Sequence, residues 1–311
     1  MTQSEAQWTF ESPATTGDDS SGVYGLPLPV DRTADAASLY LDVLKRSLTG
    51  ALAEDNDSIL GGVRTAGSTA WKRRLGNVAG RAASRADVEI VYKKPYDPKL
   101  REVGRDWPSR AESMIGLRRM DNIQHCVQTV LDDNVPGDLI EAGVWRGGAC
   151  IFMKANLMAR ADSARTVWVA DSFQGLPPPN ASLYPADTGD DLHTRPGLSV
   201  GADQVRHNFE RYGALDDRVK FLVGWFKDTL PTAPIEALSV MRLDGDLYES
   251  TWQAIEALYP KLSPGGFCII DDFGSHQSQA GQAVLDYRRT HGIDEEIVDI
   301  DGFGAFWRKR S

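Results

Sequence analysis

The feature that most constrains this chain is a regular alternation of short apolar runs with longer amphipathic segments, which begins near residue 108. The short runs predict strands, and the longer segments, whose apolar residues recur at helical spacing, predict helices. We expect strands at residues 138–144, 166–170, 219–223, 238–243 and 266–270, and helices at residues 110–131, 147–160, 200–212, 250–262 and 278–291. Strands that alternate with helices predict a parallel sheet covered by helices on both faces.

Two more strands are expected at the C-terminus, at residues 296–300 and 304–308, around the turn Asp301-Gly302. A connection this short cannot cross over the sheet, so these two strands must be antiparallel. The predicted fold class is therefore α/β, with a doubly wound, mostly parallel, Rossmann-like sheet of seven strands that ends in an antiparallel hairpin.

The N-terminal third has a different character from the rest of the chain. Residues 1–36 are rich in Ser, Thr, Gly, Pro and Asp and predict a disordered arm. Residues 37–107 form an extension with one amphipathic helix at 37–53 and a basic stretch at 59–94, which is either a solvated loop or a patch for an anionic partner. The helix either covers an apolar face or acts as a lid or subunit contact, and the main domain is expected at 108–311.

Charge and composition exclude several classes of protein. With 34 basic and 44 acidic residues the net charge is −10, which argues against a nucleic-acid partner. No apolar run is long enough to span a bilayer, and the first residues do not resemble a signal peptide, so we expect a cytoplasmic protein. The three cysteines are too far apart for a zinc site and are expected to be buried thiols.

Ligands of open α/β sheets bind beyond the carboxyl ends of the strands. The first strand is followed by a glycine-bearing turn without the G-x-G-x-x-G spacing that cradles a pyrophosphate, so it favours a ligand that has no phosphates. The alternative is a plain strand-to-helix turn. The cofactor contacts predicted in this segment are Glu141, Gly143, Arg146 and Gly147.

The second and third strands also end in candidate cofactor residues. Asp171 and Ser172 follow the second strand, where an acid can accept hydrogen bonds from both hydroxyls of a ribose. Gly224 and Trp225 follow the third strand, where an aromatic ring can lie against an adenine. Helix capping by Asp171 and core packing of Trp225 are the alternatives, but together with the glycine turn these residues indicate a nucleoside.

Acidic residues follow the fourth and fifth strands. Asp244 and Asp246 come after one strand, and Asp271 and Asp272 after the next, so the clusters should meet at one edge of the sheet. Such carboxylates repel each other unless a cation lies between them, and oxygen ligands suit magnesium or calcium. The alternative is that they are solvated helix caps.

A divalent cation at this edge would lower the pKa of an acceptor hydroxyl, but a base must still take the proton. The candidate bases are Asp244, Asp246 and His193, which lies in the long segment 176–198, and His276 is a weaker one. A structural role for either histidine is the alternative. A long segment of this kind beside a site often acts as a lid.

Several motifs in residues 96–311 together resemble the macrocin O-methyltransferase family. The motifs are MIGLRRMDN (114–122), GDLIEAGVWRGGA (137–149), DSFQGLP (171–177), GWFKDTLP (224–231), RLDGDLYEST (242–251) and SPGGFCIIDDFG (263–274), with a weaker likeness at residues 39–55. The resemblance implies a class I methyltransferase fold, S-adenosylmethionine, and Mg²⁺ held by Asp244, Asp271 and Asp272. It also implies a glycosylated small-molecule acceptor methylated on a deoxysugar hydroxyl, a base from the same acidic group, an N-terminal helix that helps to close the site, and a homo-oligomer.

Three other functions compete with sugar O-methylation. A phenol or catechol acceptor would use the same arrangement of metal and cofactor. A non-catalytic nucleoside-binding protein could use the basic stretch at 59–94 as its docking surface. A nicotinamide oxidoreductase is disfavoured because the phosphate-binding spacing is missing.

Overall fold

The structure is a computed structural model, and it describes residues 35–54, 58–59, 78–79, 82–83, 85–86, 88, 90–92, 95–274 and 278–310. The predicted arm at 1–36, apart from its last two residues, lies outside this range. Most of the basic stretch at 59–94 and the candidate base His276 also lie outside the described residues.

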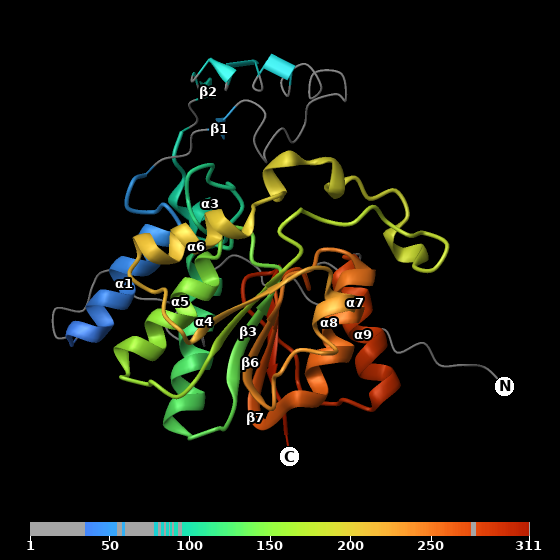
Figure 1. Cartoon of the computed structure of the whole chain (residues 1–311). Helices are drawn as coiled ribbons and strands as arrows, with labels where there is room; N and C mark the ends of the chain where they lie inside the picture. The colour runs from blue at the N-terminus through green and yellow to red at the C-terminus, as the bar shows by residue number, and fades with distance from the viewer. Residues whose placement is uncertain are drawn as a thin grey trace, which may run out of the picture.

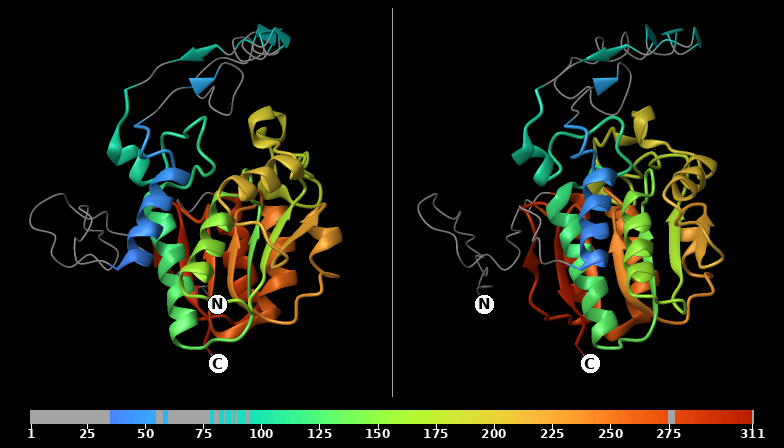
Figure 2. Two further views of the ribbon diagram at one scale, coloured as in Figure 1. Left: turned by 60° about the vertical axis from the view of Figure 1, so that its left-hand side comes forward. Right: turned by 90° about the vertical axis from the view of Figure 1, so that its left-hand side faces the viewer.

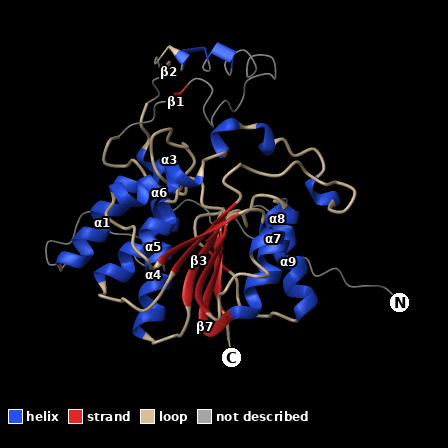
Figure 3. Ribbon diagram, in the orientation of Figure 1, coloured by secondary structure: helices blue, strands red, loops and turns tan. Residues whose placement is uncertain are grey.

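The main domain is built on one seven-stranded sheet with the order β5-β4-β3-β6-β7-β9-β8 (Figure 3). Strands β3 to β7 are parallel, and β9 runs antiparallel to both β7 and β8. The predicted fold class is confirmed, including the C-terminal hairpin. The strands are β3 (Asp138–Ala142), β4 (Val167–Asp171), β5 (Val219–Val223), β6 (Leu238–Leu243), β7 (Leu262–Ile270), β8 (Val298–Asp299) and β9 (Ala305–Arg308), with a separate pair β1 (Ser58–Ile59) and β2 (Val91–Tyr92).

Helices cover both faces of the sheet (Figure 1). The helices are α1 (Ala36–Leu48), α3 (Pro98–Glu102), α4 (Gly116–Asp132), α5 (Gly148–Ala159), α6 (Ala202–Arg211), α7 (Phe226–Thr229), α8 (Tyr248–Leu258) and α9 (Gln279–His291). Helices α1, α4, α5 and α6 pack on one face, with α1 alongside α4 and α5 (Figure 2), and α7, α8 and α9 pack on the other.

Alternate residues of each strand supply the two cores. In β3, Leu139 belongs to the core under α4 and α5, whereas Ile140 belongs to the core under α8 and α9. In β4, Val169 and Trp168 divide in the same way. Because side chains alternate along a strand, a nearly continuous apolar run fills both layers, which is what the sequence pattern of these strands predicts.

Several predicted boundaries differ from the structure, and two of the differences have a clear physical cause. Helix α4 begins at Gly116 and not at residue 110. Gly116 has φ +78°, and its backbone packs directly against Gly104, because a Cβ added at Gly116 would lie 2.3 Å from the Gly104 nitrogen. The helix predicted to reach residue 262 ends at Leu258, where Pro260 falls in a single 3₁₀ turn, and β7 then begins at Leu262.

The long segment after β4 crosses the carboxyl edge of the sheet. It contains three 3₁₀ turns, Pro185–Asp187, Leu192–Thr194 and Pro196–Leu198. The buried carboxylate of Asp187 accepts hydrogen bonds from the backbone N–H groups of Tyr248 (2.7 Å) and Glu249 (3.0 Å), so the segment is fastened to the N-terminus of α8. Within the described residues no helix is both long and apolar enough to cross a membrane.

Candidate active site

A cavity of about 720 Å³ opens at the carboxyl edge of the sheet. The ends of β3, β4, β6 and β7 form its floor, so the cavity lies beyond the carboxyl ends of the strands, where a ligand site was predicted. Its walls include segments that are distant in sequence, such as residues 103–115 before α4, residues 171–198 after β4, residues 225–227 at the start of α7, and Phe303 in the C-terminal hairpin.

The glycines of the first strand end are required by the protein's own packing. Gly143 has φ +91°, and a Cβ there would lie 1.8 Å from the carbonyl oxygen of Asp244. The Asp244 N–H donates to the Ala142 carbonyl at 2.8 Å, so β3 and β6 meet here through backbone alone. Gly147 has φ +84°, and its Cβ would lie 2.8 Å from Val205. Close contact between strand ends and helices accounts for both glycines, whereas a cofactor contact at either stays a prediction.

Asp171 lines the cavity at the end of β4, as predicted. Its carboxylate accepts hydrogen bonds from the backbone N–H groups of Val144 (2.8 Å) and Phe173 (2.7 Å), while burial raises its pKa. Ser172 donates to the Gly175 carbonyl at 2.7 Å and fixes the following turn. The turns after β3 and β4 are thus held together by one carboxylate that lines the cavity.

Within the described part of the chain, four of the predicted site residues do not line the cavity: Arg146, Gly147, His193 and Gly224. The Arg146 guanidinium donates to the carbonyls of Ser109 (2.7 Å) and Ala111 (2.9 Å), so it anchors the segment before α4. His193 is exposed in a 3₁₀ turn, so the structure does not bring it to the acidic residues. Trp225 does line the cavity.

The cofactor and base roles of Arg146 and His193 therefore gain no support from their positions. The indole of Trp145 makes the link that the sequence did not predict, because its N–H donates to the Gly197 carbonyl at 2.9 Å and ties the glycine turn to the segment above the cavity.

Asp244, Asp246 and Asp272 converge at the ends of β6 and β7. Each offers one carboxylate oxygen, and these oxygens lie within 4.8 Å of one another. Burial, followed by the negative charge of Asp271, raises the pKa of Asp246 to about 7, and burial with neighbouring carboxylates raises the pKa of Asp244 and Asp272. The Oδ2 atom of Asp272 is buried and has no hydrogen-bond partner in the described part of the chain. This arrangement fits a cation bound between the three side chains.

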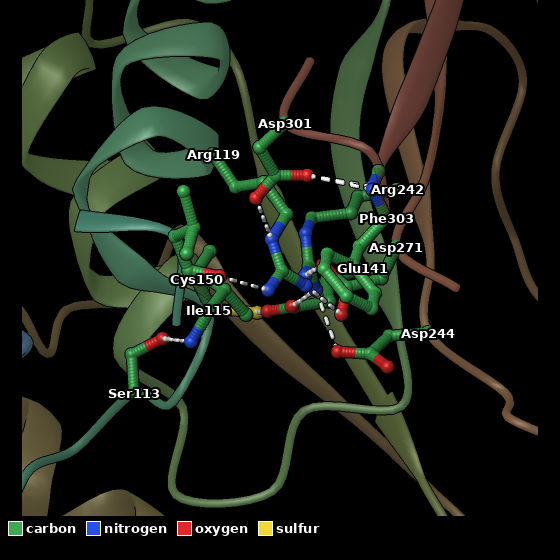
Figure 4. Close-up of polar contacts among 12 residues, drawn as sticks. Ser113, Ile115, Arg119, Glu141, Cys150, Arg242, Asp244, Asp271, Asp301 and Phe303 are labelled. Carbon is green, nitrogen blue, oxygen red and sulfur yellow. Dashed lines mark hydrogen bonds and ion pairs between the residues drawn. The ribbon is translucent and has the colours of Figure 1, made fainter. Parts of the chain in front are cut away.

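Asp271 is held differently from its neighbour. Arg119 donates to its Oδ2 at 2.7 Å, and Arg242 pairs with its Oδ1 (Figure 4). Although burial opposes ionisation, these two guanidiniums hold the pKa of Asp271 below its usual value. The structure thus brings Asp246, and not Asp271, into the group of converging oxygens, so the ligand role of Asp271 stays a prediction.

Arg242 is the centre of a buried ionic network. Its guanidinium pairs with Glu141 and Asp271 and donates to Asp244 at 3.0 Å (Figure 4). The second oxygen of Glu141 accepts a hydrogen bond from the Cys150 thiol at 2.8 Å. Glu141 lines the cavity, but both of its oxygens are engaged within the protein, so its role as a cofactor contact also stays a prediction.

Residues of the site that were not predicted from the sequence include Glu112, Arg119, Arg242 and Phe303. A signal existed for Arg242, because an arginine inside an apolar strand that is buried on both faces needs acidic partners. Glu112 is buried in the segment before α4, where it accepts hydrogen bonds from Arg211 (3.1 Å) and Tyr212 (2.9 Å). No local pattern placed Phe303 at the cavity.

Comparison with known proteins gives close relatives over most of the chain. A 4'-O-methyltransferase from Streptomyces olivaceus, named for 8-demethyl-8-(2,3-dimethoxy-alpha-L-rhamnosyl)-tetracenomycin C, is 50% identical over 278 residues, which cover 89% of this chain and 94% of the relative. The mycinamicin III 3''-O-methyltransferase of Micromonospora griseorubida is 45% identical over 274 residues, or 87% of this chain and 96% of the relative.

The solved structure of the O-methyltransferase NovP is 43% identical, with a TM-score of 0.75, and the match covers 88% of this chain and 100% of that one. The calicheamicin methyltransferase CalS11, at 20% identity and a TM-score of 0.51, shares the fold, with 62% of this chain and 79% of that one covered. Residues 37–309 match the macrocin O-methyltransferase family. Sequence, fold and relatives agree, and the chain is an O-methyltransferase that belongs to the macrocin O-methyltransferase family.

Proposed function

We propose that the protein transfers the methyl group of S-adenosylmethionine to a sugar hydroxyl of a glycosylated natural product, and that this reaction requires Mg²⁺. The observation that carries the proposal is the convergence of Asp244, Asp246 and Asp272 within 4.8 Å on the floor of the cavity. Carboxylates this close need a cation between them to be ionised together.

The donor set fits magnesium better than a transition metal. All three side chains offer oxygen, and hard oxygen ligands with water in the remaining positions suit Mg²⁺. The unpartnered Oδ2 of Asp272 gives the cation an oxygen with no competing donor. Asp244 and Asp272 are predicted ligands from the family resemblance, and the geometry favours Asp246 as the third.

The ends of β3, β4 and β5 fit a nucleoside. Asp171 lines the cavity there, and Trp225 lies at the start of α7. The glycine turn after β3 lacks the G-x-G-x-x-G spacing that holds a pyrophosphate. S-adenosylmethionine bound here supplies an electrophilic methyl group, and Mg²⁺ at the acids favours the ionised form of the acceptor hydroxyl.

The chain's own residues position the acceptor and take its proton. Asp244 and Asp272 hold the cation site against the end of the cofactor region, because Gly143 lets β3 and β6 meet directly. Asp246 is also the proposed base, since its carboxylate lies in the same cluster as the acceptor oxygen would and can take the proton of that oxygen. Trp145 ties the segment above the cavity in place and restricts access of water.

The proposed acceptor is a sugar because of what the relatives are named for. One name specifies a rhamnosyl tetracenomycin and another mycinamicin III. In this chain aromatic and polar side chains line the same cavity, including Trp107, Phe303 and Gln253, which suits a ring with one apolar face and several hydroxyls.

Methyl transfer assayed with EDTA, followed by Mg²⁺ add-back, tests the proposal. We expect EDTA to abolish turnover and Mg²⁺ to restore it, and mass spectrometry with NMR to locate the new methyl group on a sugar oxygen. Full activity in EDTA would remove the cation, and a methyl group on a phenolic oxygen would replace the acceptor class. Isothermal titration that detected neither cofactor nor Mg²⁺ binding would support a non-catalytic role.

A further inference from the structure

The C-terminal hairpin carries a turn at residues 300–304 that lies at the same sheet edge as the acidic cluster. Ala305, the first residue of β9, pairs with Ile270, the last residue of β7, which directly precedes Asp271 and Asp272. The turn therefore stands beside the cation-binding end of β7. Phe303, in the middle of the turn, lines the cavity.

The turn is fastened to the end of β7 by its backbone. The Gly274 N–H donates to the Phe303 carbonyl, and a Cβ at Gly274 would lie 2.0 Å from the Gly302 oxygen. The absence of a side chain at Gly274 thus allows direct contact between the two main chains. Movement of Phe303 relative to Asp272 would have to break this contact.

Asp301 fastens the turn a second time, through its side chain. Its buried Oδ1 accepts hydrogen bonds from the Phe303 N–H (3.1 Å) and the Gly304 N–H (2.9 Å). Its Oδ2 accepts from Arg119 Nε at 3.0 Å, and the same guanidinium donates to Asp271 at 2.7 Å (Figure 4). Arg119 therefore bridges the turn and the acidic edge with charge-assisted hydrogen bonds.

The position of Phe303 along the sheet edge places it on the acceptor side. The predicted cofactor residues follow β3, β4 and β5, and the acidic cluster follows β6 and β7, with β9 and β8 beyond it. In-line transfer puts the acceptor oxygen at the acidic cluster, opposite the methyl donor, so the body of the acceptor extends away from the cofactor. Phe303 lies on this side of the cavity and lines it, and the Arg105 guanidinium lies 4.6 Å from the centre of its ring.

We propose that Phe303 determines acceptor specificity by packing against the apolar face of the acceptor sugar, and that Asp301 is the positioning residue that holds this ring in register with the acidic cluster. The inference rests on the proposed function for its acceptor class. An aromatic ring fits this role because one face of a pyranose presents C–H groups, while Arg105 offers donors to its hydroxyls.

Steady-state kinetics of Phe303→Ala, Phe303→Tyr and Asp301→Asn test the inference. The probe is whichever of the rhamnosyl tetracenomycin, mycinamicin III or demethyldecarbamoylnovobiocin the wild type methylates fastest. Phe303→Ala should raise the acceptor KM about tenfold, and Phe303→Tyr should restore it to within about twofold, because the ring is retained. Asp301→Asn should raise the acceptor KM about fivefold with little change in kcat, since the substitution weakens the hold on the turn that carries Phe303 and leaves the reacting groups in place.

The matched control is Asp299→Asn. Asp299 lies in the same hairpin and accepts a hydrogen bond from the Gly302 N–H at 3.0 Å, but its carboxylate is not paired with Arg119. This variant removes the same charge, so it should leave the acceptor KM within about twofold of wild type if the Arg119 bridge is what matters. Binding of S-adenosylhomocysteine, measured by calorimetry, should match wild type in all four variants and reports correct folding.

Each outcome separates this inference from the proposed function. An unchanged acceptor KM in Phe303→Ala, or an equal rise for acceptor and cofactor, overturns the role of Phe303 even where EDTA abolishes activity. Activity that resists EDTA removes the cation, yet a tenfold, tyrosine-rescued KM effect would still establish Phe303. If calorimetry shows that the wild type binds none of the three acceptors, the acceptor class and this inference fall together.

Discussion

The two halves of the cavity use their polar atoms in opposite ways. At the ends of β3 and β4, the Asp171 carboxylate accepts hydrogen bonds from backbone N–H groups. Gly143 packs directly against the main chain of Asp244. At the ends of β6 and β7, carboxylates converge and one oxygen of Asp272 has no partner within the described residues. The cofactor half is thus complete without a ligand, whereas the acidic half is compatible with full ionisation only when a cation is present.

The arginines of the acidic half explain how the chain folds around so much negative charge. Arg119 and Arg242 neutralise Asp271, and Arg242 also neutralises Glu141, so the charges nearest the core are paired. Asp246 and Asp272 converge with Asp244 and have no arginine partner among the ion pairs of the described residues, so they are left for a ligand. The comparison therefore predicts that stability resides in the paired acids and turnover in the unpaired ones.

The largest expected effect is on stability, from Arg242→Met. Removing the guanidinium leaves Glu141 and Asp271 buried without their partner, which should lower the free energy of unfolding by about 3–5 kcal/mol. Urea unfolding followed by circular dichroism measures it. The control is Arg289→Met, an exposed arginine paired with Asp286, which should cost about 1 kcal/mol or less. Equal losses in the two variants would break the assignment of stability to the network.

The next effect is on turnover, from Asp272→Ala. We expect kcat to fall about 10²-fold, or roughly 3 kcal/mol of barrier, because the cation loses the oxygen that has no competing donor. The free energy of unfolding should change little, and Asp217→Asn, an exposed acid far from the cavity, should keep wild-type kinetics. A variant with wild-type kcat and Mg²⁺ affinity would refute the proposed ligand.

Asp271→Ala sharpens the contrast between adjacent acids. It should also lower turnover about 10²-fold, but unlike Asp272→Ala it should lower stability as well, since Arg119 and Arg242 lose their shared partner. Thermal unfolding and Mg²⁺ titration measured on both variants separate the two roles. Loss of Mg²⁺ affinity without loss of stability in Asp271→Ala would make Asp271 a ligand, as the family resemblance implies.

In the cofactor half the sharpest test is a pair of glycine substitutions. Gly143 and Gly189 both have positive φ. A Cβ added at Gly143 would clash with Asp244, whereas a Cβ added at Gly189 would have no atom within 4 Å. Gly189→Ala should cost about 1 kcal/mol from backbone strain, and Gly143→Ala at least about 2 kcal/mol more. Denaturant midpoints compare them, and equal costs would mean that β3 and β6 do not depend on this contact.

The smallest effect is expected at Arg146. Because its guanidinium holds the carbonyls of Ser109 and Ala111, Arg146→Gln should change the affinity for S-adenosylhomocysteine by about twofold or less, whereas Asp171→Asn should weaken it about tenfold. Calorimetry measures both. A large loss at Arg146 would restore it as a cofactor contact.

Local patterns predicted the elements of the fold well. The strands at 219–223 and 238–243 match β5 and β6 residue for residue, since an apolar run with turn residues at both ends leaves little choice of boundary. The predicted start of α4, residue 110, was wrong by six residues. The helix begins at Gly116 because of the contact between Gly116 and Gly104, which no local pattern encodes. Helix ends depend on tertiary contacts more than helix centres do.

Taken alone, the sequence determined the order of strands and helices, the position of acids and glycines at the strand ends, and the family. Those features follow from side-chain periodicity and from chain connectivity, which are local. Only the tertiary structure decided which acid pairs with arginine and which faces the cavity, that Arg146 and His193 point elsewhere, and that Phe303 joins the site. These outcomes depend on the direction of side chains from elements distant in sequence, so the neighbours Asp271 and Asp272 acquire different partners: Asp271 pairs with two arginines, and Asp272 joins the other acids.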